Sequence, residues 1–402
     1  MRTQQLWIAA AVVAALALVI VVGLSARDGG VAVASPTPSL RATPSASATA
    51  ATSASASAPT AASAGPTGGA GNSAVYNDDF GFIVTDVGTG ARVRTESGAP
   101  VQGLSFDQQG FAVSPDGKLV AYWSVGTSSQ PSQLRMFTTQ GNATQQTLIT
   151  LPAGTRGGGI AWSSDGAGLL YSTETGTFGI GGGTNSATLN IYELSPGGPH
   201  GTVIDTQTNT GFLYRPIAWD RSVNLAAAGL TGEGGFLGTY VTVRINANGS
   251  FTAQRSNTAS QDIAMGTVRA STDAKLVLGV DGTGKVRWWP VADVGAIKTA
   301  AGTGTAGARW QPGTHKIGFL SADNGFVLFN ADDGSAATPL TGIRAGSVLR
   351  TFRADGSAVV FAVIPPGSSG LGSTDYALTR LADRASVTFQ ATGGLGPSVR
   401  LR

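Results

Sequence analysis

The chain alternates short apolar runs with polar turns, and one such arrangement returns six times. The clearest copies are residues 111–122 (FAVSPDGKLVAY) and 160–171 (IAWSSDGAGLLY). Each copy has an apolar segment, a tight polar turn and a second apolar segment, which is the pattern of a β-hairpin. Looser copies occur at residues 217–228, 268–279, 308–319 and 349–361. Copies spaced roughly 40 to 57 residues apart are typical of propeller blades, so the sequence predicts a repeat architecture.

The turns of these hairpins contain proline, aspartate and glycine in fixed places. Proline presets φ, the aspartate side chain can bond its own downstream backbone, and glycine tolerates positive φ. We therefore expect a structural role for these side chains. The residues are Pro115, Asp116, Gly117, Asp165, Gly166, Asp273, Asp355 and Gly356.

A second pair of apolar segments follows each hairpin, as at residues 133–137 with 146–151 and residues 240–245 with 251–255. Four strands per repeat predict an all-β fold made of propeller blades. Two further strands are expected at residues 80–85 and 91–95, and a last short strand at 397–401. Strands from both ends of the chain would then share one sheet, which removes free sheet edges. Six complete units and this split blade predict seven blades, with six as the alternative.

The Ser-Pro-Asp-Gly turn at residues 114–117 resembles the WD40-like (PD40) repeats of TolB-type propellers. Residues 164–166 match this signature in part, and residues 354–356 match it weakly. The resemblance covers residues 76–402 and implies a β-propeller. Such propellers occur in binding proteins, in assembly factors and as accessory domains of peptidases, so the resemblance implies no single function.

The first 34 residues carry an uncharged run from Leu6 to Leu24, preceded by Arg2. At 1.5 Å per residue such a helix is about 28 Å long, close to the hydrocarbon thickness of a bilayer. We expect a transmembrane signal-anchor at residues 1–34, with the C-terminal part outside the cytoplasm, in a bacterial cell envelope. The alternative is a secreted protein, cleaved near Ala34. Residues 35–75 are rich in Ser, Thr, Ala and Pro and predict a disordered linker before a propeller domain at 76–402.

Charge and composition exclude several kinds of chemistry. The net charge is +3, of which the first 75 residues supply +2, so the propeller is close to neutral and no nucleic-acid partner is expected. The chain has no cysteine and two histidines, His200 and His315, both in predicted turns and expected to be solvated. We therefore expect no cofactor, no metal site and no catalytic residues.

The tryptophans fall into two groups. Trp162, Trp219 and Trp310 occupy the same place in three copies, which predicts packing between blades. Trp288 and Trp289 are adjacent and should point to opposite faces of a strand. We expect one of these two in the core and the other as an exposed contact.

The expected binding surface is the face that carries the longer loops and the links between blades, because loops on a rigid scaffold usually carry function. Its candidate residues are Phe178, Glu233, Phe236, Asp262 and Arg344. The leading hypothesis is a non-catalytic binding platform for a protein, a peptide or an envelope glycan. One alternative is a hydrolase or lyase that acts on sugars or lactones through carboxylates in the channel. A third is a sensor or assembly component whose anchor helix contacts another membrane protein.

Overall fold

A computed structural model provides the fold of the C-terminal part of the chain. It describes residues 73–401 apart from 79–80, 87–91, 98–110, 125–130, 140–144, 177–183, 209–211, 232–234, 259–261, 304–306, 322–324, 337–338, 342, 344–346, 354, 364–373 and 392–399. The predicted anchor and linker up to residue 72, and the candidates Phe178, Glu233 and Arg344, lie outside the described residues. No helix within the described part is long and apolar enough to cross a membrane.

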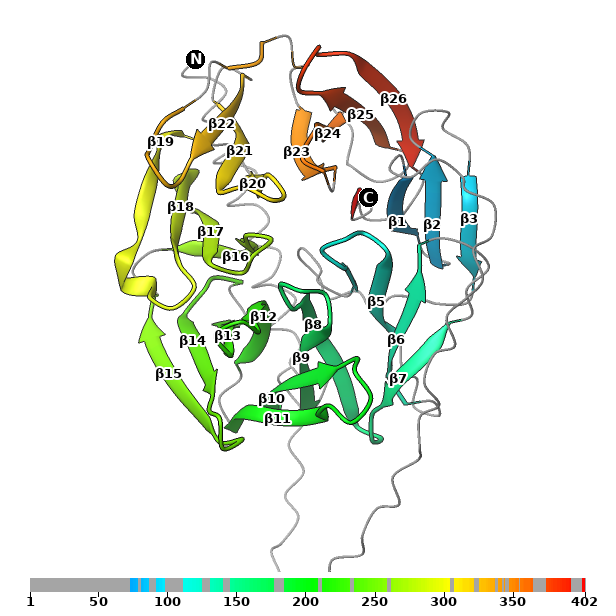
Figure 1. Ribbon diagram of the computed structural model, residues 1–402, viewed down its shortest axis with the longest axis vertical. Coiled ribbons are helices and arrows are strands. Elements are labelled where there is room, and N and C mark those ends of the chain that lie inside the picture. Colours follow the sequence, from blue (N-terminus) through cyan, green and yellow to red (C-terminus); the bar gives the residue numbers. More distant parts are fainter. Residues whose placement is uncertain are drawn as a thin grey trace, which may run out of the picture. The chain divides into compact units, whose positions relative to one another are not determined.

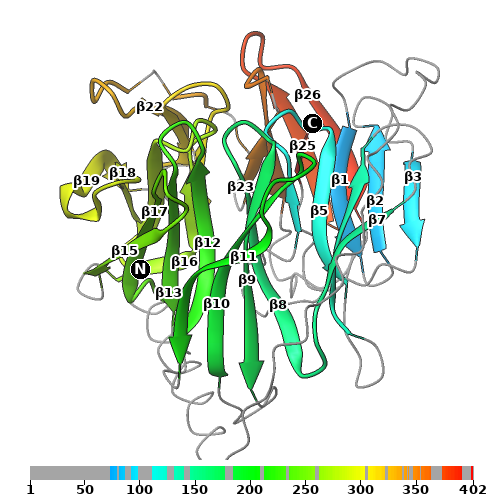
Figure 2. The ribbon, with the colours of Figure 1, turned by 60° about the horizontal axis from the view of Figure 1, so that its bottom comes forward.

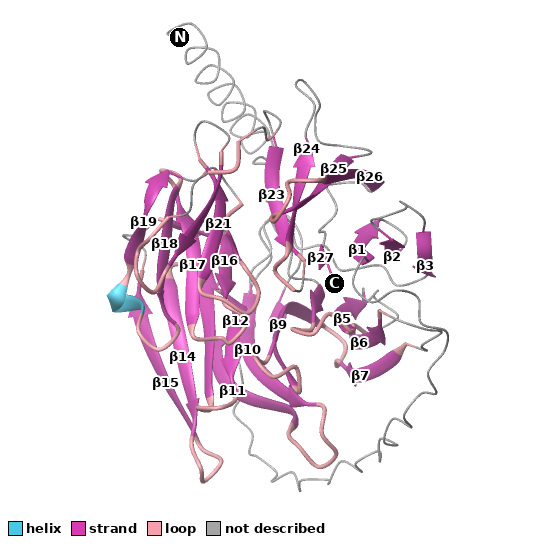
Figure 3. Cartoon of the chain, turned by 45° about the horizontal axis from the view of Figure 1, so that its top comes forward, coloured by secondary structure: helices cyan, strands magenta, loops and turns pink. Residues whose placement is uncertain are grey.

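The described residues form seven antiparallel sheets, and each is arranged as a propeller blade (Figure 1). Blade 1 consists of β4 (Phe111–Val113), β5 (Leu119–Ser124), β6 (Gln133–Thr138) and β7 (Gln146–Thr150). Blade 2 consists of β8 (Thr155–Trp162), β9 (Gly168–Gly176), β10 (Thr184–Glu193) and β11 (His200–Thr208). Blade 3 consists of β12 (Leu213–Asp220), β13 (Leu225–Thr231), β14 (Thr239–Ile245) and β15 (Phe251–Asn257). Blade 4 consists of β16 (Ile263–Ala270), β17 (Leu276–Asp281), β18 (Lys285–Pro290) and β19 (Lys298–Thr303). Blade 5 consists of β20 (Arg309–Trp310), β21 (Lys316–Leu320) and β22 (Phe326–Asn330). Blade 6 consists of β23 (Ser347–Phe352), β24 (Ala358–Val363), β25 (Thr374–Arg380) and β26 (Ser386–Ala391). Within this part of the chain the helical content is one short turn, Val294–Ala296, and Figure 3 shows how strands dominate.

The closing sheet joins the two ends of the described chain. Its order is β27-β1-β2-β3, from Arg400–Leu401, Ser73–Asp78, Gly81–Asp86 and Arg92–Ser97. Val75 pairs with Arg400 and Ala74 with Leu401. This matches the expected sharing of one sheet by both ends, and β2 and β3 lie at the expected strands. Strand β1 is an addition to the sequence prediction, and the predicted domain start at residue 76 lies inside it.

Blade 5 has three strands among the described residues, where the other sheets have four. In place of a fourth strand, two isolated antiparallel bridges join Phe326 to Leu340 and Phe329 to Ala336. A short, weakly paired segment therefore takes the outer place in this blade.

The hydrophobic core lies between successive blades rather than within them. Strands of blades 2 and 3 share one cluster, in which Leu170, Ile191 and Trp219 are buried together. Blades 3 and 4 share another around Trp289, and blades 4 and 5 share a third around Trp288. From β4 to β27, the first strand of each blade lies beside the first strand of the next, around the common centre seen in Figure 1. Figure 2 shows the strands of these blades from the side. Blades 3 and 4 are thus covered by a neighbouring blade on both faces, as repeat architectures require.

Both tryptophan predictions can be judged from this packing. The Trp162 indole N–H donates to the Ala112 carbonyl of blade 1, and the Trp310 indole N–H donates to the Arg269 carbonyl of blade 4, each over 2.9 Å. Packing between blades is therefore confirmed for this position. The expectation that Trp288 or Trp289 is an exposed contact is wrong, because the two side chains are 6% and 0% exposed. They do point to opposite faces of β18, but a neighbouring blade covers each face.

Candidate functional site

The two ends of the blades differ, and we name them by what they carry. The turn face holds the turns between the first two strands of each blade, such as residues 114–117 and 163–166. The loop face holds the connections between the second and third strands and the links between blades. Antiparallel geometry places these two sets at opposite ends of every sheet.

The aspartates of the turn face hold their own turns closed. Asp116 Oδ1 accepts from Ser114 Oγ at 2.6 Å and from the Lys118 N–H at 3.1 Å. Partial burial alone would raise the pKa of Asp116, but these hydrogen bonds lower it below its usual range. Gly117 has φ +74°, the conformation that favours glycine.

The same geometry recurs in the other turns. Asp165 and Asp273 accept from the serine two residues earlier, and Asp355 accepts from Ser357, at 2.6–2.7 Å. Gly166 and Gly356 also have positive φ, at +71° and +70°. These hydrogen bonds and glycine conformations hold the turns closed.

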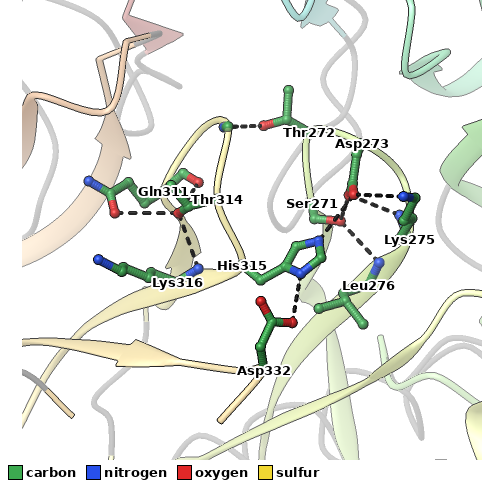
Figure 4. A network of polar contacts seen from close by, with 11 residues as sticks. Ser271, Thr272, Asp273, Lys275, Leu276, Gln311, Thr314, His315, Lys316 and Asp332 are labelled. Carbon is green, nitrogen blue, oxygen red and sulfur yellow. Dashed lines mark hydrogen bonds and ion pairs between the residues drawn. The ribbon is translucent and has the colours of Figure 1, made fainter. Parts of the chain in front are cut away.

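His315 links two blades and differs from its prediction as a solvated turn residue. Its Nδ1 lies 2.8 Å from Asp332 Oδ1, and its Nε2 lies 3.0 Å from Asp273 Oδ2 in blade 4 (Figure 4). The imidazole is 25% exposed. Partial burial would lower the pKa of His315, but the two carboxylates raise it above its usual range. This link could not be predicted from the sequence, because Asp332 and Asp273 are 17 and 42 residues from His315 along the chain.

A cavity of about 290 Å³ opens at the centre of the turn face. The first strands of blades 1 to 6 line it, together with the starts of several turns. Its described lining contains two charged side chains, Arg269 and Arg309, and no carboxylate. The carboxylate cluster that a channel hydrolase or lyase would need is thus absent from this described lining.

The two cavity arginines are held by backbone carbonyls. Arg309 Nε donates to the Arg350 carbonyl at 2.8 Å, and Arg309 Nη1 donates to the Ala308 carbonyl at 2.9 Å. Arg269 Nη1 donates to the Val268 carbonyl at 2.7 Å. Aligning the repeat copies would have found this pair, because both arginines stand at the same place before the turn.

A second group of charges lies on the first strands nearer the loop face. Arg156 of β8 forms an ion pair with Glu174 of β9, whose side chain is 3% exposed. Burial lowers the pKa of Arg215 on β12, and Glu174 opposes that shift. Two arginines thus share one buried carboxylate. No group of metal-ligating side chains occurs among the residues that the structure describes.

The loop face presents Phe236 on a segment that is bonded on several sides. Met265 N–H donates to the Gly235 carbonyl at 2.9 Å, and Leu237 N–H donates to the Ile263 carbonyl at 2.8 Å. Thr258 donates to the carbonyls of Leu237 and Gly238, at 2.7 and 3.0 Å. Leu237 is fully buried, whereas Phe236 is 49% exposed. The segment is therefore fixed to blade 4, with the phenylalanine turned outward.

Phe212, which the sequence analysis did not single out, stands beside this segment. It is 42% exposed, and a Cβ atom built on Gly238 would lie 4.0 Å from Phe212 Cε1. Asp262, the other described candidate of this face, has φ +48° and accepts from the Gly282 N–H at 3.0 Å through its carbonyl. Of the predicted binding residues, Phe236 and Asp262 thus lie next to the start of β16.

Comparisons with known proteins give no family and no function for this chain. No protein-family model matches the chain, and no curated protein sequence matches it. Among solved structures, it is similar to a chain of the mitotic checkpoint complex, with 12% identity, a TM-score of 0.48 and coverage of 74% of this chain and 83% of that one. It is also similar to an oligogalacturonate lyase in complex with manganese, with 14% identity, a TM-score of 0.48 and coverage of 78% of this chain and 82% of that one. A prolyl endopeptidase has 13% identity and a TM-score of 0.49, and the match covers 84% of this chain and 50% of that one. These neighbours carry names of different functions, and none of these functions is assigned to this chain.

Proposed function

We propose that this chain is a non-catalytic binding platform whose loop face takes a protein or peptide partner at Phe236 and Phe212. The observation that carries the proposal is the exposed Phe236 ring on a segment whose neighbouring backbone groups are bonded to blades 3 and 4. Aromatic side chains are enriched at interfaces, and a fixed segment loses little freedom on binding.

The setting of this platform follows from the predicted N-terminal segments. An anchor at residues 1–34 and a linker at 35–75 would tether the propeller outside the cytoplasm. The alternative of a channel hydrolase or lyase finds no support in the described cavity lining, which offers arginines where that chemistry needs an acid and a base.

The test uses a photo-crosslinking amino acid in the full-length chain, placed at position 236 in one variant and at position 223 in another. Val223 is 51% exposed in the β12–β13 turn on the opposite face, so it is a matched control. A partner that crosslinks from position 236 and not from 223 supports the proposal. Equal capture from both positions, or capture from 223 alone, contradicts it.

The captured partner is then purified and its affinity measured. We expect Phe236→Ser to weaken binding by about tenfold or more, the loss typical of a buried aromatic anchor, and Val223→Ser to change it less than twofold. An affinity that Phe236→Ser and Phe212→Ser leave unchanged would refute the loop-face site. A captured glycan instead of a polypeptide would correct the class of partner.

A further inference from the structure

The residues that face the central cavity divide it into two halves. Each first strand of blades 1 to 6 has a residue four positions before the middle of its turn, as Ala112 stands before Asp116, and this residue lines the cavity. At this position blades 1 to 3 carry alanine, blades 4 and 5 carry arginine and blade 6 carries threonine. The residues are Ala112, Ala161, Ala218, Arg269, Arg309 and Thr351, and all of them line the cavity.

The arginine half is prepared for an anion. Bonds to the carbonyls of Val268, Ala308 and Arg350 fix where the guanidinium groups of Arg269 and Arg309 lie. Guanidinium is planar, stays charged at any physiological pH and presents N–H groups in a fork that matches the two oxygens of a carboxylate. Both arginines line the same cavity, so a carboxylate bound there can contact two guanidinium groups.

Charged residues on the first strands, farther from the turn face than the cavity, also favour a negatively charged ligand. Arg350 of β23, Arg215 of β12 and Arg156 of β8 add three cations to the two at the cavity. Glu174 lies beside Arg156 and Arg215 and is bonded to Arg156, and Asp220 of β12 is bonded to Ser222. Although the propeller is nearly neutral as a whole, its first strands are strongly basic, and low-dielectric walls strengthen the attraction for an anion.

The alanine half of the cavity and the cavity volume limit the size and polarity of the rest of the ligand. Three methyl groups, with Ile160 and Pro216 beside them, form an apolar wall opposite the arginines. A cavity of about 290 Å³ is at the small end of the range for ligand sites. It fits a short hydrocarbon body and leaves no room for a long one.

We propose that the central cavity binds a small amphipathic carboxylate, with its anionic group at Arg269 and Arg309 and its apolar body against Ala112, Ala161 and Ala218. This chemistry is shared by free short-chain carboxylic acids and by the C-terminal carboxylate of a peptide that ends in an apolar residue. The site lies on the turn face and is separate from the loop-face surface proposed above, so either can fail without the other.

The test measures binding to the full-length chain by titration calorimetry. The probes are hexanoate with hexanamide as its neutral match, and an N-acetylated tripeptide ending in leucine, as the free acid and as the amide. We expect each acid to bind at least tenfold more tightly than its amide. A stronger signal from hexanoate identifies a free acid as the source, and a stronger signal from the tripeptide acid identifies a peptide end. Equal binding of acid and amide overturns the proposal.

Variants locate the site. We expect Arg269→Gln and Arg309→Gln each to weaken acid binding about tenfold, and Arg380→Gln, an exposed arginine of β25, to leave it unchanged. Because Arg309 also bonds the backbone of β23, its loss can harm folding, so Ala161→Leu is the second kind of variant. This change fills the apolar half and should abolish hexanoate binding while leaving both arginines in place. Unchanged affinity in Arg269→Gln and Ala161→Leu, or equal binding of inorganic phosphate, refutes the site.

Discussion

Arg221 Nη1 of blade 3 lies 2.7 Å from Asp165 Oδ2, so the turn of blade 2 is tied to the next blade. The same guanidinium lies 3.1 Å from Glu193 Oε1, at the turn between β10 and β11. His315 and Asp273 repeat the arrangement between blades 4 and 5, and the Gln311 side-chain amide donates to the Gly356 carbonyl between blades 5 and 6. Polar ties at the turn face thus supplement the apolar contacts between blades.

We predict a small contribution from the Arg221–Asp165 pair, because both side chains are partly exposed to solvent. A double-mutant cycle with Arg221→Ala and Asp165→Ala should give a coupling free energy of at most about 1 kcal/mol, which decreases with added salt. Chemical denaturation of the four proteins provides the measurement. A coupling of several kcal/mol, or one that salt does not affect, would contradict this view of the pair.

The His315 pair predicts a stability that depends on pH. Since the folded-state pKa of His315 is raised, its contribution is complete below the unfolded pKa of about 6.5 and is lost as pH rises through the folded pKa. Partial burial alone would raise the pKa of Asp273, but its hydrogen bonds lower it, so Asp273 remains ionised throughout this window. We expect the difference in melting temperature between the wild type and His315→Gln to be largest near pH 5.5 and to shrink towards pH 9.

Nuclear magnetic resonance provides an independent reading of the same group. In a His200→Gln background one imidazole remains, and its titration should have a midpoint above 6.5 that falls on Asp332→Asn substitution. A midpoint below 6.5, or a melting difference that is constant from pH 5.5 to 9, would show that the two carboxylates do not stabilise the imidazolium.

Close packing between blades 2 and 3 predicts that Gly168→Ala is destabilising. A Cβ atom at Gly168 would lie 2.5 Å from Trp219 Cζ3 and 3.0 Å from the Tyr192 carbonyl oxygen, and Trp219 is 1% exposed. We expect a loss of about 1–3 kcal/mol in the free energy of unfolding. Gly282→Ala is the control, because its nearest neighbours would be at 3.9–4.0 Å. Equal effects of the two substitutions would argue against the clash.

The closing sheet predicts that the C-terminus is essential for stability. A chain ended at residue 396 lacks β27 and leaves the inner edge of β1 unpaired, which invites pairing with other chains. We expect a lower melting temperature and association into oligomers, measured by calorimetry and light scattering. A short glycine–serine extension after residue 402 is the control. A truncated chain that melts like the wild type and stays monomeric would contradict closure by β27.

Local patterns carried most of the fold prediction. The turn residues could be read from the sequence because Asp116 and Gly117 act on their immediate neighbours. Strand β1 was not predicted, because residues 73–78 (SAVYND) continue a stretch rich in serine and alanine. They form a strand through their pairing with β2 and β27. The burial of Trp288 was not predicted. The alternation along a strand shows that Trp288 and Trp289 point to opposite faces, but it does not show that a neighbouring blade covers each face.

The candidate sites depend on contacts between residues distant in the sequence. Phe236 and Asp262 were accessible to prediction because loop positions follow from counting strands. Phe212 was not, because its place near Gly238 brings together two loops that are separate in the sequence. The Arg269 and Arg309 pair lies 40 residues apart in the sequence and becomes a pair through the ring of first strands.

Pairing of Val75 with Arg400 also sets when the ring can be completed. These partners are about 325 residues apart, so ribosomal synthesis at roughly 5–20 residues per second separates their appearance by about 15–65 s. During that delay the inner edge of β1 is unpaired, because β27 has not yet been synthesised. The six intervening blades can form in the meantime from local hairpins. Strand β27 therefore completes the ring after the intervening blades can have formed, and the slow step of folding should be this closure.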